Sequence, residues 1–162
     1  MPIPPFVAAL REKVGTDLLW LPGVTAVVLD DEERVLLTQR SDSGQWALVS
    51  GILEPGEEPA HAMVREIKEE TGVDAVVDGL AAVMVLEPMQ YPNGDRSQYL
   101  DLIFVCRATG GEAHPGDDES IAVGWFAVDD LPEGTGHHTE ERLAEVAAFR
   151  ANPAAGARFA RP

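Results

Sequence analysis

Three glutamates stand at positions that a helix would bring together. Glu66, Glu69 and Glu70 have the spacing i, i+3, i+4, so a helix places their carboxylates within an arc of about 100°. Like charges at this spacing destabilise an isolated helix by about 0.2–0.5 kcal/mol per pair. The row is therefore either a solvated face of an acidic protein or a site for a hard divalent cation, because Mg²⁺, Mn²⁺ and Ca²⁺ prefer oxygen ligands.

The segment that leads into this row favours the cation site. Gly51 and Gly56 lie near its two ends, and glycine permits tight backbone turns and the close approach of a ligand. Glu57 adds a fourth carboxylate just before the helix. Arg65 supplies a planar cation that can pair with Glu57 and fix the loop against the helix.

The row needs a helix, and residues Pro59–Thr71 are expected to form one. This segment has proline in its first turn, helix-forming residues throughout, and Gly72 just beyond its end. Its apolar residues fall in an arc beside the carboxylates, so the helix is expected to pack by that stripe. The stripe consists of Ala60, Met63, Val64 and Ile67.

The remaining elements alternate between strand and helix patterns. An amphipathic helix is expected over residues 4–14, with Phe6, Val7, Leu10 and Val14 on one side, and a last helix over 139–150, with Leu143, Val146, Ala147 and Phe149 buried. We expect His137 and His138 to lie in the loop before it. Apolar, β-branched runs predict strands at 24–29, 35–38, 46–49, 52–53, 73–86, 99–107 and 123–128, with a turn-rich loop at 88–97. The pattern predicts an α/β (α+β) fold, a mixed sheet covered on its faces by helices.

Residues 51–73, read as one string, resemble the 23-residue Nudix box at every specified position. Gly51 is followed by five residues, Glu57, seven residues, and then Arg65-Glu66-Ile67-Lys68-Glu69-Glu70-Thr71-Gly72-Val73. The resemblance implies an α/β/α sandwich with a Nudix hydrolase domain at residues 18–152. Residues 1–17 would be an N-terminal helix for packing or a dimer contact, and 153–162 a C-terminal tail.

The resemblance also implies a metal-dependent pyrophosphatase. Such hydrolases cut the diphosphate linkage of a nucleoside diphosphate joined to another moiety, such as ADP-ribose or a dinucleoside polyphosphate, with Mg²⁺ or Mn²⁺. Carried over by position, Glu66, Glu69 and Glu70 are the catalytic, metal-binding carboxylates, with a backbone carbonyl near Ser50 or Gly51 as a further ligand. Glu57 and Arg65 would form the structural ion pair of the box, with Glu57 also reaching a metal through water, and Gly51 and Gly72 would be the box glycines.

Two alternatives share this fold. One is a nucleoside triphosphate pyrophosphohydrolase of the house-cleaning type, and the other is a non-catalytic nucleotide-sensing Nudix domain. A diphosphate isomerase of the same fold would need a reactive cysteine. The one cysteine, Cys106, lies in an apolar strand pattern, where a thiol is expected to be buried and inert.

The general base stays open between two places, and the candidates for substrate contacts lie outside the row. In the family the base is either a box glutamate or an acid from a distant loop, and Glu119, in the loop 116–120, is the distal candidate. Arg40 and Arg96 are candidates for contacts to substrate phosphates. Pro88 and Tyr91 stand where the ADP-ribose and dinucleoside polyphosphate hydrolases of the family carry a proline and a tyrosine. Trp46, Tyr91 and Tyr99 are candidates to stack on a base, Trp46 being expected in the core.

Charge and composition bound the partners. Twelve basic and 28 acidic side chains give a formal charge of −16, which argues against nucleic acid as a partner. A phosphate compound can bind only where metal ions or placed arginines reverse the repulsion. The sequence has no apolar stretch long enough for a membrane span and no leader pattern, so a cytoplasmic protein is expected. A homodimer is left open, with the N-terminal helix as the candidate contact.

Overall fold

Two long parallel strands form the centre of the sheet in the computed structural model, which describes residues 3–116 and 118–161. β1 (Leu18–Leu29) pairs with β7 (Arg96–Gly110) along its whole length, from Leu18 opposite Arg96 to Leu29 opposite Arg107. β5 (Asp74–Val85) pairs antiparallel with the other side of β7, and the short β6 (Met89–Gln90) pairs with the start of β7. The loop expected at 88–97 is therefore partly a β-hairpin.

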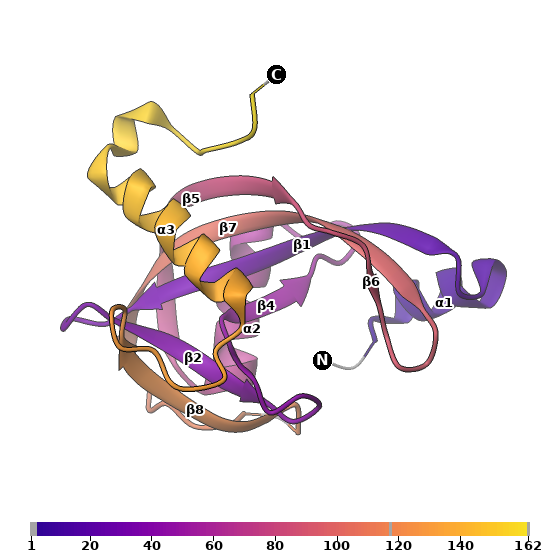
Figure 1. Cartoon of the computed structure of the whole chain (residues 1–162), viewed down its shortest axis with the longest axis horizontal. Coiled ribbons are helices and arrows are strands. Elements are labelled where there is room, and N and C mark those ends of the chain that lie inside the picture. Colours follow the sequence, from indigo (N-terminus) through magenta and orange to yellow (C-terminus); the bar gives the residue numbers. More distant parts are fainter. Residues whose placement is uncertain (1–2, 117, 162) are drawn as a thin grey trace.

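The other side of β1 is shared between two strands. β4 (Val49–Ile52) runs antiparallel beside the middle of β1, from Gly23 to Ala26, whereas β2 (Arg34–Arg40) meets β1 in the register pair Leu29 with Val35. β2 also pairs with β3 (Trp46–Ala47) and β8 (Ser120–Ala127). As a result β2 and β8 diverge from β1, and β4 lies between β1 and β2 (Figure 1).

Helices cover the two faces of this mixed sheet, as the sequence predicts. α2 (Pro59–Thr71) packs on one face and α3 (His137–Ala151) on the other. Successive side chains of a strand point to opposite faces, so β1 and β7 each supply both cores. The α2 core includes Val24, Val28, Phe104, Met63 and Ile67; the α3 core includes Val27, Leu29, Ile103, Val105 and Val146.

α2 has the bounds that its sequence signals predict. It begins at Pro59, and Gly72 ends it in the left-handed conformation with φ 70°. Met63 and Ile67 are fully buried, as expected of the apolar stripe. Cys106 is also buried in the α2 core, and burial raises the pKa of its thiol to about 12.

α1 (Pro5–Val14) forms as expected, but its burial is less than its pattern predicts. Val7 is buried, whereas Leu10 and Val14 are 38% and 37% exposed. The prediction that they pack inward is wrong because α1 lies beyond the end of the sheet, where only part of its surface meets other elements (Figure 1).

α3 begins two residues earlier than expected. His137 and His138 form its first turn, so their assignment to a loop is wrong; Gly136 is the extended N-cap, and its carbonyl accepts a hydrogen bond from Thr139 N–H. Val146 is buried, but Ala147 is exposed, contrary to expectation. Leu143 and Phe149, both partly buried, pack against the same core as Val146, and this stripe turns position 147 outward.

The C-terminal tail is attached to the sheet rather than trailing from it. Arg158 N–H donates to Ala81 O, and its carbonyl accepts from Val83 N–H, each at 2.8 Å. The Arg158 guanidinium also pairs with Glu145 on α3. These contacts cover part of β5, the last strand of the sheet. Within the described part of the chain, no helix is long and apolar enough to cross a membrane.

Candidate functional site

The carboxylate row lies on α2 with different degrees of burial. Glu66 and Glu70 are 4% and 9% exposed, whereas Glu69 is exposed to solvent. Burial raises the pKa of Glu66 to about 7, although the adjacent Arg65 opposes this shift. A cation beside Glu66 would therefore stabilise its charged form.

Gly51 lies directly against the Glu66 carboxylate. A Cβ atom at position 51 would lie 2.5 Å from Glu66 Cδ, a distance that packing does not allow. Gly51 and Ser50 are both strand residues of β4, and Glu33 is the one non-glycine residue of the described ranges with positive φ. Ser50 is thus in extended backbone, while the glycine at position 51 is needed for the close approach to Glu66.

Arg65 connects three of the four carboxylates. Its Nε and Nη2 donate to the two oxygens of Glu57 at 2.9 and 3.1 Å. Its Nη1 donates to Glu66 at 3.1 Å and to Glu69 at 2.9 Å. The hydrogen bonds from Arg65 are the main cause that lowers the pKa of Glu57. The bidentate pair fixes the entering loop against α2.

The donor chemistry of this cluster fits a hard divalent cation. Four carboxylates and the β4 backbone supply oxygen ligands of the kind that Mg²⁺ and Mn²⁺ prefer. However, no three His, Cys, Asp or Glu side chains among residues 3–116 and 118–161 already stand in a metal-holding arrangement. Arg65 instead pairs with Glu57, Glu66 and Glu69, so a cation held by this row would compete with Arg65 for these carboxylate oxygens.

A distant loop packs on the C-terminal end of α2. His114 N–H donates to Thr71 O at 3.0 Å, and Gly116 N–H donates to Glu70 O at 2.9 Å, which satisfies carbonyls that a helix end leaves without partners. The same loop leads to Glu119, whose carbonyl accepts from Ser41 N–H at 2.7 Å. The structure thus brings the backbone of Glu119 beside Ser41, just past the end of β2. Asp117, in the same predicted loop, lies outside the described residues.

Arg40 lies at the end of β2, opposite Ser120 of β8. Its guanidinium donates to both oxygens of Asp42, at 3.0 and 2.6 Å. These hydrogen bonds are the main cause that raises the pKa of Arg40, and the negative charge of Glu70 adds to it. Arg40 is therefore within electrostatic range of the carboxylate row.

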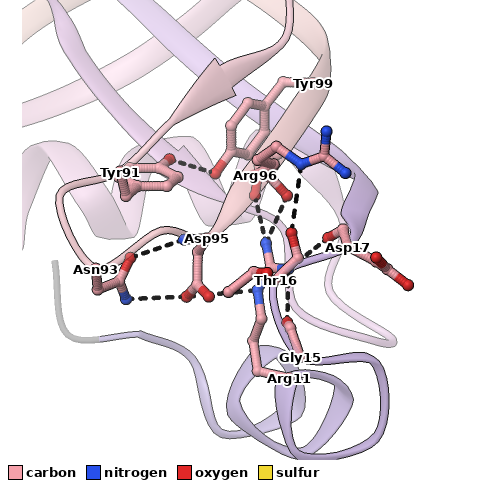
Figure 2. Close-up of polar contacts among 10 residues, drawn as sticks. Arg11, Gly15, Thr16, Asp17, Tyr91, Asn93, Asp95, Arg96 and Tyr99 are labelled. Carbon is pink, nitrogen blue, oxygen red and sulfur yellow. Dashed lines mark hydrogen bonds and ion pairs between the residues drawn. The ribbon is translucent and has the colours of Figure 1, made fainter.

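Tyr91 and Tyr99 come together in the hairpin of β6 and β7. Their hydroxyl oxygens are 2.8 Å apart (Figure 2). Burial raises the pKa of Tyr91, and the hydrogen bond to Tyr99 raises it further. Arg96 is not brought to this pair: its Nε donates to Thr16 O at 3.5 Å, and Figure 2 shows the guanidinium directed away from Tyr91. Pro88, the other substrate marker, is exposed.

Trp46, considered as a base-stacking residue, is half-buried. Its ring meets Phe126 edge to face at a centroid distance of 4.8 Å, beside the α3 core. Such aromatic pairs prefer this geometry, so the packing role expected for Trp46 fits its environment.

Two polar groups outside the carboxylate row were not predicted from the sequence. Asp101, 2% exposed, accepts a hydrogen bond from Thr25 at 2.8 Å and pairs with Arg142 of α3. An acid within an apolar strand pattern is the signal that would have identified it. Arg11, which contacts the hairpin of Tyr91, has no such signal, because one arginine on a short helix is ordinary.

Comparisons with known proteins agree with this geometry. The NUDIX domain model matches residues 19–146. The crystal structure of the MutT NUDIX hydrolase from Burkholderia pseudomallei is 30% identical in sequence, with a TM-score of 0.65 over 79% of this chain and 98% of that one.

Two relatives have names that state an enzymatic activity. The ADP-ribose pyrophosphatase of Methanocaldococcus jannaschii is 34% identical over 120 residues, 71% of this chain and 68% of that protein. The human 8-oxo-dGDP phosphatase NUDT18 is 32% identical over 151 residues, 90% of this chain but only 42% of that protein. The fold and these relatives define a hydrolase that acts on phosphorus anhydrides. The chain belongs to the NUDIX domain family.

Proposed function

We propose that this hydrolase depends on Mg²⁺ or Mn²⁺ and cleaves the diphosphate linkage of a nucleoside diphosphate joined to another moiety, of which ADP-ribose is the example. The observation that carries the proposal is the carboxylate row of α2, with Glu66 buried against Gly51 and Glu70 buried beside it. The name of the Methanocaldococcus jannaschii relative supports ADP-ribose as the first substrate to test.

In this proposal Glu66, Glu69 and Glu70 hold the cations, and Glu57 contributes through water. Bound divalent ions would neutralise the diphosphate and lower the pKa of an attacking water. Such charge reversal is required because the chain carries a formal charge of −16, which otherwise repels an anionic substrate. Arg65 keeps Glu57 and the entering loop in place through its bidentate pair.

The remaining roles follow from position. A carboxylate accepts the proton of the attacking water, either from the row or from Glu119, whose loop packs on the end of α2. Arg40, at the end of β2 and in electrostatic range of Glu70, contacts a substrate phosphate. Tyr91 contacts the nucleotide from the hairpin. The guanidinium of Arg96 points away from Tyr91, and its contact with substrate stays a prediction.

A substrate panel tests this function. ADP-ribose, diadenosine polyphosphates, UDP-sugars and (deoxy)nucleoside triphosphates are each incubated with Mg²⁺ and with Mn²⁺, and the products are identified. The proposal expects cleavage between the two phosphorus atoms of a nucleoside diphosphate compound, giving AMP and ribose 5-phosphate from ADP-ribose. Cleavage restricted to triphosphates would establish the house-cleaning alternative, and binding of nucleotides without cleavage would establish a sensor.

A further inference from the structure

Arg11 joins the first helix to the hairpin that carries Tyr91. From α1, its Nη1 donates to Asp17 O at 2.6 Å and to Gly15 O at 3.2 Å. Its Nη2 donates to Arg96 O at 2.6 Å and to Ser97 Oγ at 3.0 Å. One guanidinium thereby connects segments about eighty residues apart in sequence (Figure 2).

Arg11 also reaches the turn of the hairpin. Its Nε lies 3.5 Å from Asp95 Oδ2, and the two side chains are only 12% and 18% exposed. A charge this little exposed must be satisfied by partners, and the planar guanidinium, with five N–H donors, can serve several acceptors at once. Its partners lie on the helix end, the turn and the start of β7.

The turn transmits this anchoring to Tyr91. Asp95 Oδ2 also accepts a hydrogen bond from Asn93 Nδ2 at 3.0 Å, and Asp95 N–H donates to Asn93 Oδ1 at 3.1 Å. The backbone carbonyl of Asp95 accepts from Tyr91 N–H at 2.9 Å, and Tyr91 O accepts from Gly94 N–H at 2.9 Å. Arg11 therefore fixes Asp95, and Asp95 fixes the backbone of Tyr91.

The tyrosine pair has one further support. Tyr99 extends from β7, where its ring lies against β1: a Cβ atom at Gly23 would lie 3.4 Å from Tyr99 Cδ1. Tyr99 is thus placed by the sheet itself, whereas Tyr91 depends on the turn. The distance of 2.8 Å between their hydroxyl oxygens can be kept only if the turn stays in register with β7.

We propose that Arg11 is a positioning residue for substrate binding: through Asp95 it holds Tyr91 beside Tyr99, where the pair contacts the nucleotide. This inference rests on the proposed function, because it takes the tyrosine pair as part of the substrate site. It gives α1 a role in recognition that is distinct from packing. Arg11 does not contact the carboxylate row, so its loss should affect binding and leave the chemical step intact.

The test compares the kinetics of three variants with wild type on whichever nucleotide the wild type cleaves. Arg11→Ala is expected to raise KM about tenfold and keep kcat, since hydrogen bonds from a charged group are lost. Arg11→Lys should recover part of the loss, because an ammonium serves fewer acceptors than a guanidinium. Lys13→Ala removes an exposed cation from the same helix and is expected to behave as wild type.

Hydrogen–deuterium exchange supplies a second readout that does not need activity. In Arg11→Ala, amides of residues 89–99 should exchange faster while α2 keeps its protection. If Arg11→Ala fails to fold, Asp95→Asn removes the ion pair alone and is expected to give the same increase in KM and in exchange, to a smaller extent.

The outcomes separate the two claims. Faster exchange in the hairpin with an unchanged KM would show that Arg11 is structural only and would overturn the inference. Unchanged exchange, or a loss in kcat without a change in KM, would also overturn it. If the wild-type protein neither cleaves nor binds any nucleotide, that result would instead overturn the proposed function, and with it the substrate role of the hairpin.

Discussion

Gly51 and Glu66 approach each other so closely that position 51 admits no side chain. An added Cβ would lie 2.5 Å from Glu66 Cδ, and the buried Glu66 carboxylate, held by Arg65, has little room to move aside. Gly51→Ala should therefore displace Glu66 and lower kcat/KM about 10²-fold, as misplacement of a reacting group by about 1 Å can do. Steady-state hydrolysis rates measure the effect.

Gly110→Ala is the matched control for this substitution. A Cβ there would lie at an ordinary 3.6 Å from Asp74 Oδ2, so activity should remain. Full activity of Gly51→Ala would show that the position of Glu66 does not matter for the reaction.

Gly116 holds the distal loop on α2 in a comparable way. A Cβ at this position would overlap Glu69 O and lie 2.9 Å from the Glu69 carbonyl carbon. Because a helix backbone cannot yield as a side chain can, Gly116→Ala should lift the loop and lower the free energy of unfolding by about 1–3 kcal/mol. Urea denaturation measures this, and an unchanged midpoint would contradict the packing described.

The carboxylate helix was predictable because its signals are local. Pro59 in the first turn and Gly72 after the last turn define α2 from sequence neighbours alone, and the spacing of Glu66, Glu69 and Glu70 follows from helix geometry. The strand patterns at 24–29 and 99–107 are local signals as well, but the division of their residues between the two cores was not predicted.

The pair Arg40 and Asp42 makes stability depend on acidity. The hydrogen bonds from Arg40 are the main cause that lowers the pKa of Asp42 to about 2. A lowered pKa contributes stability that is present above the usual value of 3.8 and is lost as the pH falls towards 2. The pair is exposed, so the contribution is small.

The difference in unfolding free energy between wild type and Asp42→Asn measures this contribution. It should be constant from pH 7 to about pH 5 and shrink between pH 4 and pH 2. A difference that grows as the pH falls would have the wrong sign for this interaction.

The ion pair between Asp101 and Arg142 attaches α3 to the sheet in a buried position. Arg142→Met leaves the Asp101 carboxylate buried without this cation, while Thr25 Oγ1 still donates to it. Removing one partner of a buried ion pair lowers the free energy of unfolding by about 3–5 kcal/mol. The double variant Asp101→Leu with Arg142→Met removes both charges and should be less destabilised than the single one. Equal losses of unfolding free energy in the single and the double variant, measured by urea denaturation, would contradict a buried ion pair.

The tertiary contacts could not be predicted from the sequence in the same way. Arg11 meets Arg96 O and Ser97 across more than eighty residues, and no local pattern encodes that meeting. Leu10 and Val14 were expected to be buried from periodicity, but periodicity reports an apolar face and not whether an element lies against it. His137 and His138 belong to α3 because Gly136, the residue before them, is the N-cap of the helix. From the sequence alone, this pair was assigned to a loop.

The most direct test of the central claim is the rate of ADP-ribose hydrolysis as Mg²⁺ or Mn²⁺ is titrated, for wild type, Glu70→Gln and Glu140→Gln. Glu140 is an exposed residue in the first turn of α3 and is the matched control. The account predicts no turnover with a chelator, saturable activation by the metal in wild type and Glu140→Gln, and a rate lower by about 10²-fold or more in Glu70→Gln. Turnover that survives both chelation and the loss of the Glu70 carboxylate would contradict it.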